Sequence, residues 1–117
     1  RDLSMALALI NKVFATFRDR SGLEVVCGDT ELADVQRVFN SDQVKMAGGG
    51  GTDMGALIKE IANRKSPPQL LVVATDGDTG WCHRNDVPKK IPVVVALTND
   101  CYRKQVPEWM TCVSLNP

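Results

Sequence analysis

The sequence has no excess of either charge and no long hydrophobic run. Fourteen Lys and Arg residues balance fourteen Asp and Glu residues, so the formal net charge at pH 7 is zero. Proteins that bind nucleic acids through the phosphates usually carry a basic excess, so this balance argues against that class. No apolar run approaches the roughly 20 residues that a membrane-spanning helix needs, and the first residues do not form a signal-peptide pattern. We therefore expect a cytoplasmic protein whose partners include neither nucleic acid nor membrane.

Several motifs of metal sites and nucleotide sites are also missing. The four cysteines form no Cys-x-x-Cys pair and His83 is the sole histidine, so we expect free thiols, with a zinc site at Cys82 and His83 as the alternative. The glycine run at residues 48–51 continues into Thr52 and Asp53, which matches neither a P-loop nor the Rossmann glycine fingerprint. No His-Glu-x-x-His occurs, so these residues are not expected to carry zinc-peptidase activity.

What is present predicts one α/β domain over residues 1–117, with a Rossmann-like, doubly wound and mostly parallel sheet. Of the residues 44% are hydrophobic and 24% charged, the mixture of an ordinary globular domain. Apolar residues at helical spacing predict helices over residues 3–17 and from Thr52 or Asp53 toward the prolines at 67 and 68. Short or unbroken apolar runs predict strands over residues 23–27, 35–39, 70–74, 92–97 and 110–115. The strand over residues 35–39 is expected at the edge of the sheet, paired back in a hairpin.

Polar turns follow these strands. One is the glycine run into Thr52 and Asp53, the second covers residues 75–78, and the third covers residues 98–100. Ligands of open parallel sheets bind outside the carboxyl ends of the strands, where these turns are expected to lie. Carboxylate and hydroxyl oxygens suit Mg²⁺ or Mn²⁺, with charge from Asp76 and a neutral oxygen from Thr52. The alternative is ordinary turn and capping chemistry, in which the same residue types are common.

Asp76 and Asp78 also permit an enzymatic interpretation. Phosphatases of the haloacid dehalogenase type carry Asp-x-Asp-x-Thr or Asp-x-Asp-x-Val after a strand, where one Asp attacks phosphorus and the other serves as acid. In this sequence Gly80 stands at the fifth position of that motif. A phosphoryl-transfer hydrolase using Asp76 and Asp78 is therefore an alternative function.

One succession of motifs resembles a known family. Residues 49–53 read Gly-Gly-Gly-Thr-Asp, an amphipathic helix follows, and residues 70–77 read Leu-Leu-Val-Val-Ala-Thr-Asp-Gly. This succession resembles a von Willebrand factor type A domain, and with Trp81 close behind it is most similar to the C-terminal A-like domain of predicted bacterial metallopeptidase-like proteins. The resemblance implies a metal ion-dependent adhesion site at the carboxyl rim of the sheet. It makes Thr52 and Asp76 metal ligands, and it places Gly51, Asp53 and Asp78 in the second shell or on the rim.

The first motif of that family, Asp-x-Ser-x-Ser after the first strand, is not present. Residues 2–6 match it only in part, because Ala6 replaces the last serine and no strand precedes it. The chain also begins at Arg1 rather than methionine, so we expect the family's first strand upstream, in a longer parent protein. By the resemblance that strand would lie between residues 23–27 and 70–75. Binding of Mg²⁺ or Mn²⁺ is conditional on it.

The resemblance implies a non-catalytic protein-interaction module that uses a rim metal ion to hold a carboxylate of a protein partner. Intracellular domains of this family often accompany AAA+ ATPases, so a system of that kind is the expected partner. Trp81, beside the rim, could anchor the partner or pack over the sheet edge. Besides the hydrolase, the remaining alternative is a structural domain with a vestigial metal site.

Overall fold

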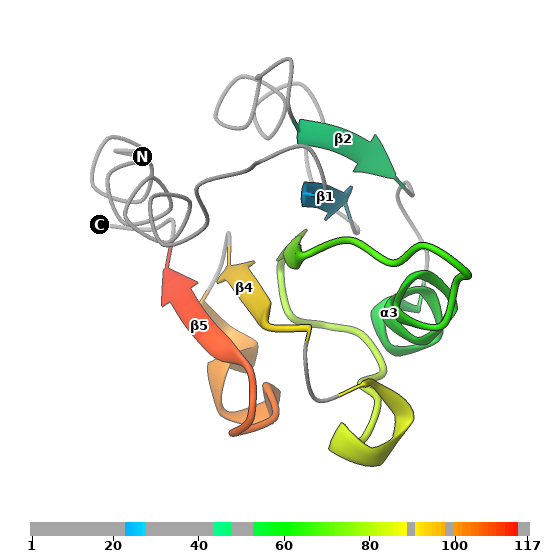
Figure 1. The fold of residues 1–117 in the computed structure, drawn as a ribbon. Helices are drawn as coiled ribbons and strands as arrows, with labels where there is room; N and C mark the ends of the chain where they lie inside the picture. The colour runs from blue at the N-terminus through cyan, green and yellow to red at the C-terminus, as the bar shows by residue number, and fades with distance from the viewer. Residues whose placement is uncertain (1–22, 28–43, 48–52, 89–90, 98–99, 115–117) are drawn as a thin grey trace.

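The computed structural model describes residues 23–27, 44–47, 53–88, 91–97 and 100–114. Within these ranges one sheet contains five strands in the order β2-β1-β3-β4-β5, and every neighbouring pair is parallel (Figure 1). The strands are β1 Leu23–Cys27, β2 Val44–Ala47, β3 Leu70–Thr75, β4 Val93–Leu97 and β5 Thr111–Ser114. The parallel sheet confirms the predicted α/β class.

One α-helix and two 3₁₀ segments accompany the sheet in the described ranges. They are α3 Met54–Ala62, η1 Arg84–Asp86 and η2 Asp100–Gln105. Figure 1 shows all three on the same side of the sheet, with η1 in yellow and η2 in orange. The helix that the sequence predicts after the glycine run is therefore confirmed, and it begins directly after Asp53.

The unbroken apolar runs form strands that are covered on both faces. All residues of β3 and β4 are buried. Leu71 and Val73 belong to the same core cluster as Ile58 of α3, whereas the alternate residues Leu70 and Val72 are buried on the opposite face. This burial explains why the two strands contain no alternation of polar and apolar residues.

The apolar stripe of α3 faces the sheet. Met54, Ile58 and Ile61 are fully buried in the core cluster, whereas Lys59 and Glu60 are exposed. The spacing of three and four residues puts the apolar side chains on one side of the helix. At the far end of α3, the side chain of Arg64 forms an ion pair of 3.1 Å with Glu24 of β1.

One feature of the sheet differs from the sequence-based expectations. β2 was not expected; it has four residues and pairs in parallel with β1, whereas a hairpin strand would be antiparallel. Its short Val-Lys-Met-Ala sequence carries little strand signal. β1 pairs directly with β3, from Leu23 opposite Leu70 to Cys27 opposite Ala74, so in this chain no strand lies between them. The edge strand expected over residues 35–39 and the helix expected over residues 3–17 lie outside the described residues.

We expect Ile58→Ala to lower the free energy of unfolding by about 2–5 kcal/mol, because it leaves a cavity beneath α3. Glu60→Ala, on the exposed side of the same helix, should change it by less than about 0.5 kcal/mol. Urea denaturation of both variants measures the difference. Equal effects would contradict the orientation of α3.

Candidate functional site

The loop that follows β3 lies against the start of α3. We call residues 76–82 the rim loop. The backbone N–H of Met54 donates to the Thr79 hydroxyl at 2.8 Å, and the N–H of Gly55 donates to the Gly80 carbonyl at 2.9 Å. These bonds join two segments that are about 25 residues apart in the sequence.

The first turn of α3 has no backbone donor left over. In addition to the two bonds to the rim loop, the N–H of Ala56 donates to the side chain of the N-cap residue Asp53 at 3.1 Å. The N–H of Leu57 donates to the Asp53 carbonyl at 3.1 Å. A helix N-terminus can bind phosphate only through unpaired N–H groups. The start of α3 is therefore not an anion site.

Gly55 permits this close approach of two backbones, and Gly80 lies beside the side chain of Asp53. A Cβ atom on Gly55 would lie 2.7 Å from the carbonyl carbon of Trp81, and one on Gly80 would lie 2.7 Å from Oδ2 of Asp53. The sequence-based interpretation did not single out Gly55 or Thr79, and it named Gly80 only for its place in the phosphatase-like motif. A signal was available, because glycine inside a helix costs about 1 kcal/mol relative to alanine and so suggests a packing reason.

Asp76 stands at the carboxyl tip of β3 and is half-buried. Its Oδ1 accepts a hydrogen bond of 2.9 Å from the backbone N–H of Asp78, while the Thr75 hydroxyl accepts one of 3.1 Å from the N–H of Gly77. Gly77 has a φ of 91°, which favours glycine. The turn after β3 therefore fixes the orientation of the Asp76 carboxylate. Asp78 is exposed.

Thr52 and Gly51 lie outside the described residues, so the predicted approach of Thr52 to Asp76 stays a prediction. Asp53, the next residue, is described. Its carboxylate caps α3 and lies beside Gly80 of the rim loop. The chain directly after Thr52 thus lies against the loop that carries Asp76.

The third predicted turn is described only in part, because residues 98 and 99 lie outside the described ranges. Asp100 accepts a hydrogen bond of 3.2 Å from the Ser114 hydroxyl and lies 3.8 Å from the Arg103 guanidinium. The bond from Ser114 ties η2 to the end of β5, whereas the ion pair lies within η2. Within the described ranges, no group of three or more His, Cys, Asp or Glu side chains could hold a metal ion.

Trp81 packs against the core cluster and is half-buried. Its indole nitrogen is buried, and so is that of Trp109; neither has a hydrogen-bond partner in the part of the chain that the structure describes. Trp81 therefore packs the rim loop, of which it is a part, against the core cluster. Its role as a partner anchor stays a prediction.

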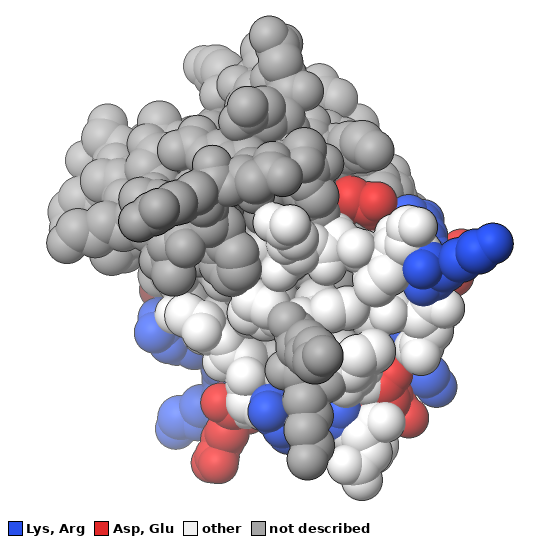
Figure 2. All heavy atoms as spheres, in the orientation of Figure 1, with Lys and Arg blue, Asp and Glu red and all other residues white. Residues whose placement is uncertain are grey.

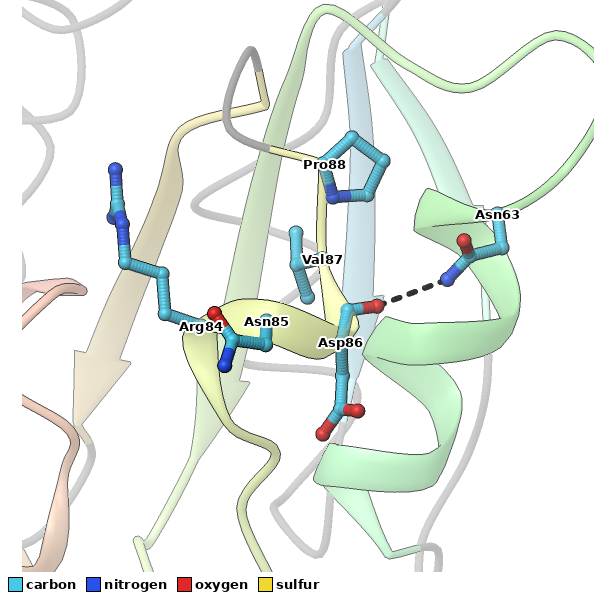
Figure 3. A pocket seen from close by; sticks show the side chains of 6 residues that line it. All are labelled: Asn63, Arg84, Asn85, Asp86, Val87 and Pro88. Atoms are coloured by element: carbon cyan, nitrogen blue, oxygen red, sulfur yellow. Dashed lines mark hydrogen bonds between the residues drawn. The ribbon is translucent and has the colours of Figure 1, made fainter.

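A cavity of about 330 Å³ lies between the end of α3 and η1. Figure 3 shows Asn63 and Asp86 on facing sides, joined by a bond of 3.0 Å from the Asn63 amide to the Asp86 carbonyl, with Arg84 extending away from Asn63. The guanidinium of Arg84 instead lies over the Trp109 ring, 6.0 Å from its centre. These polar groups hold η1 in place and do not converge on a common point.

Two described cysteines are poor candidates for ligands or nucleophiles. Cys82 is buried and Cys112 is half-buried, and neither forms a disulfide. Burial raises the pKa of both thiols, so at neutral pH they are protonated. His83 beside Cys82 is exposed.

The described residues on the face that Figure 2 shows are mixed in charge. Figure 2 shows Lys and Arg interspersed with Asp and Glu on the visible face, without a single basic patch. In the ranges that the structure covers, no helix has the length and apolar character needed to cross a membrane.

Comparison with known protein families gives a match over nearly the whole chain. The family model described as "VWA-like domain (DUF2201)" matches residues 1–116. Neither the curated proteins nor the solved structures give a match to this chain.

The close contact at Gly55 generates a prediction. Alanine is the better helix former by about 1 kcal/mol, yet we expect Gly55→Ala to destabilise the protein by about 1–3 kcal/mol, because its methyl group would meet the Trp81 backbone. The control is Ala56→Gly at the adjacent exposed position, which should cost about 1 kcal/mol from propensity alone. Thermal unfolding measures both. A stabilised Gly55→Ala variant would mean that the rim loop does not contact α3.

Proposed function

The chain belongs to the family of VWA-like domains, and on this basis we propose that it is a non-catalytic protein-interaction module with a divalent-ion site at the carboxyl rim of its sheet. The observation that carries the proposal is the position of Asp76. Its half-buried carboxylate stands at the tip of β3, in the loop that contacts the start of α3. Thr52, two residues before Met54, is the second proposed ligand.

The chemistry of these donors fits a hard cation. Mg²⁺ and Mn²⁺ prefer carboxylate and hydroxyl oxygens, and Mg²⁺ sites usually contain one or two carboxylates together with several waters. A site of this kind does not require a cluster of acidic residues. Further ligands are proposed from an Asp-x-Ser-x-Ser strand that precedes Arg1 in the full-length protein, and ion binding is conditional on that strand.

The orientation of Asp76 supports its proposed role. The hydrogen bond from the Asp78 N–H holds Oδ1 of Asp76 in a fixed direction. A side chain that is already ordered loses less conformational entropy when it binds.

When bound, the ion would supply an open coordination position that a partner carboxylate fills. We propose an intracellular protein partner, with an AAA+ ATPase system as the class that the family resemblance suggests, and Trp81 as a neighbouring contact. The chain itself would carry no catalytic residue. A peptidase activity, if the parent has one, would lie in a separate domain.

We expect Asp76→Asn to weaken Mn²⁺ or Mg²⁺ binding by the full-length protein by more than about 100-fold. The substitution removes the charged ligand of the ion. Even the loss of a residue that only orients a ligand typically lowers metal affinity by about 10–100-fold. Glu60→Gln is the control for loss of a carboxylate elsewhere, because Glu60 is exposed on α3 and lies outside the rim. Titration calorimetry measures both affinities.

The alternative functions predict different results for the wild-type protein and these variants. A wild-type protein that takes up neither ion, without heat or thermal shift, has a vestigial site. Hydrolysis of a generic phosphoester that depends on Mg²⁺ and is lost in both Asp76→Asn and Asp78→Asn would instead establish the phosphoryl-transfer hydrolase. Unchanged affinity in Asp76→Asn would refute Asp76 as a ligand.

A further inference from the structure

The sequence contains one Asp-Gly pair, at residues 76 and 77, and no Asn-Gly pair. An Asp-Gly pair is chemically labile, because glycine has no side chain that shields its backbone nitrogen from the neighbouring carboxyl group. The nitrogen of Gly77 bonds to Cγ of Asp76, and the carboxyl hydroxyl leaves as water together with the hydrogen of that nitrogen. The product is a cyclic imide.

Hydrolysis opens the imide at either of its carbonyl carbons. Water that adds at Cγ restores aspartate. Water that adds at the main-chain carbonyl carbon of residue 76 breaks the original peptide bond and leaves the chain linked through the side chain, which is isoaspartate. One water is released and one is consumed, so the change needs solvent alone and no oxidant or reductant.

The turn after β3 restrains both reacting groups. The N–H of Gly77 donates to the Thr75 hydroxyl at 3.1 Å, and Thr75 is only 1% exposed, so this bond is shielded from water. The N–H of Asp78 donates to Oδ1 of Asp76 at 2.9 Å, which directs the carboxylate to that N–H. Attack on Cγ therefore requires the turn to open.

Packing on Gly77 also opposes the reaction. Gly77 is buried, and a Cβ atom on it would lie 3.0 Å from Cβ of Tyr102 and 3.2 Å from Cδ2 of Leu97. The glycine therefore lies against η2 and β4. Ring closure has to move Gly77 relative to the Asp76 side chain, and these neighbours leave little room for that movement.

We propose that residues 76 and 77 are the site at which this protein forms isoaspartate, and that the bond from Gly77 to the Thr75 hydroxyl suppresses the reaction in the folded state. The reaction then proceeds from a locally opened turn, which costs less free energy than global unfolding. Isoaspartate would add a methylene group to the backbone of the turn and move the carboxylate of residue 76 to its α-carbon. The inference concerns the covalent stability of the turn, so it does not depend on ion binding.

The test incubates variants of the full-length protein below their unfolding temperatures and measures isoaspartate at residue 76 by mass spectrometry with electron-transfer fragmentation. Thr75→Val keeps the shape of the side chain and removes the hydroxyl, whereas Thr75→Ser keeps the hydroxyl. Thr111→Val makes the same change at an exposed position of β5. Ile58→Ala is the control for lower global stability, because Ile58 is buried beneath α3 and leaves the turn intact.

We expect Thr75→Val to form isoaspartate about fivefold faster than the wild type, the factor that corresponds to the loss of one hydrogen bond. Thr75→Ser, Thr111→Val and Ile58→Ala should retain the wild-type rate. The wild-type protein unfolded in urea should react more than about tenfold faster than the folded protein, because the turn no longer has to open. If Thr75→Val does not fold, Thr75→Ala replaces it, since it also lacks the hydroxyl.

Three outcomes overturn the inference. Equal rates in the folded and the urea-unfolded wild type would show that the turn gives no protection. A folded Thr75→Val or Thr75→Ala protein with the wild-type rate would exclude the hydroxyl as the protecting group. A faster reaction in Ile58→Ala than in Thr75→Val would assign the protection to global stability instead of the turn.

Discussion

The contact between the start of α3 and the rim loop is the constraint on which the candidate site depends. It requires glycine at 55, since a Cβ atom there would lie 2.7 Å from the backbone carbonyl carbon of Trp81. It also uses the backbone donors of Met54 and Gly55, which a helix otherwise leaves to solvent. One arrangement therefore caps the helix and fixes the loop that carries Asp76.

The sheet gives this contact a rigid base. β3 and β4 are buried on both faces, and their register places Thr75 opposite Leu97 at the same edge. Asp76 thus follows a strand whose end is held in place by packing. Met54 and Ile58 anchor α3 to the core cluster. Sites built on such elements are better defined than sites on long loops.

The distribution of donors and acceptors distinguishes the kinds of ligand that the rim accommodates. The backbone N–H groups in the first turn of α3 donate to Asp53, Thr79 and Gly80, so none is left to bind an anion. Asp76 instead presents a carboxylate whose orientation the turn sets. Membership of the VWA-like family establishes the fold, whereas function has to be argued from such groups, because one fold can serve many functions.

The amino-acid sequence by itself determined the local elements and the family. The unbroken runs of β3 and β4, the stripe of Met54, Ile58 and Ile61, and the position of Asp76 at a strand end all follow from short-range patterns. Only the tertiary structure decided the rest: the short β2 beside β1, the direct pairing of β1 with β3, and the bonds from Thr79 and Gly80 to α3. The physical reason is the distance along the sequence, because hydrophobic periodicity reports only on residues a few positions apart. Contacts between segments about 25 residues apart depend on the order of strands in the sheet and on how closely two backbones approach.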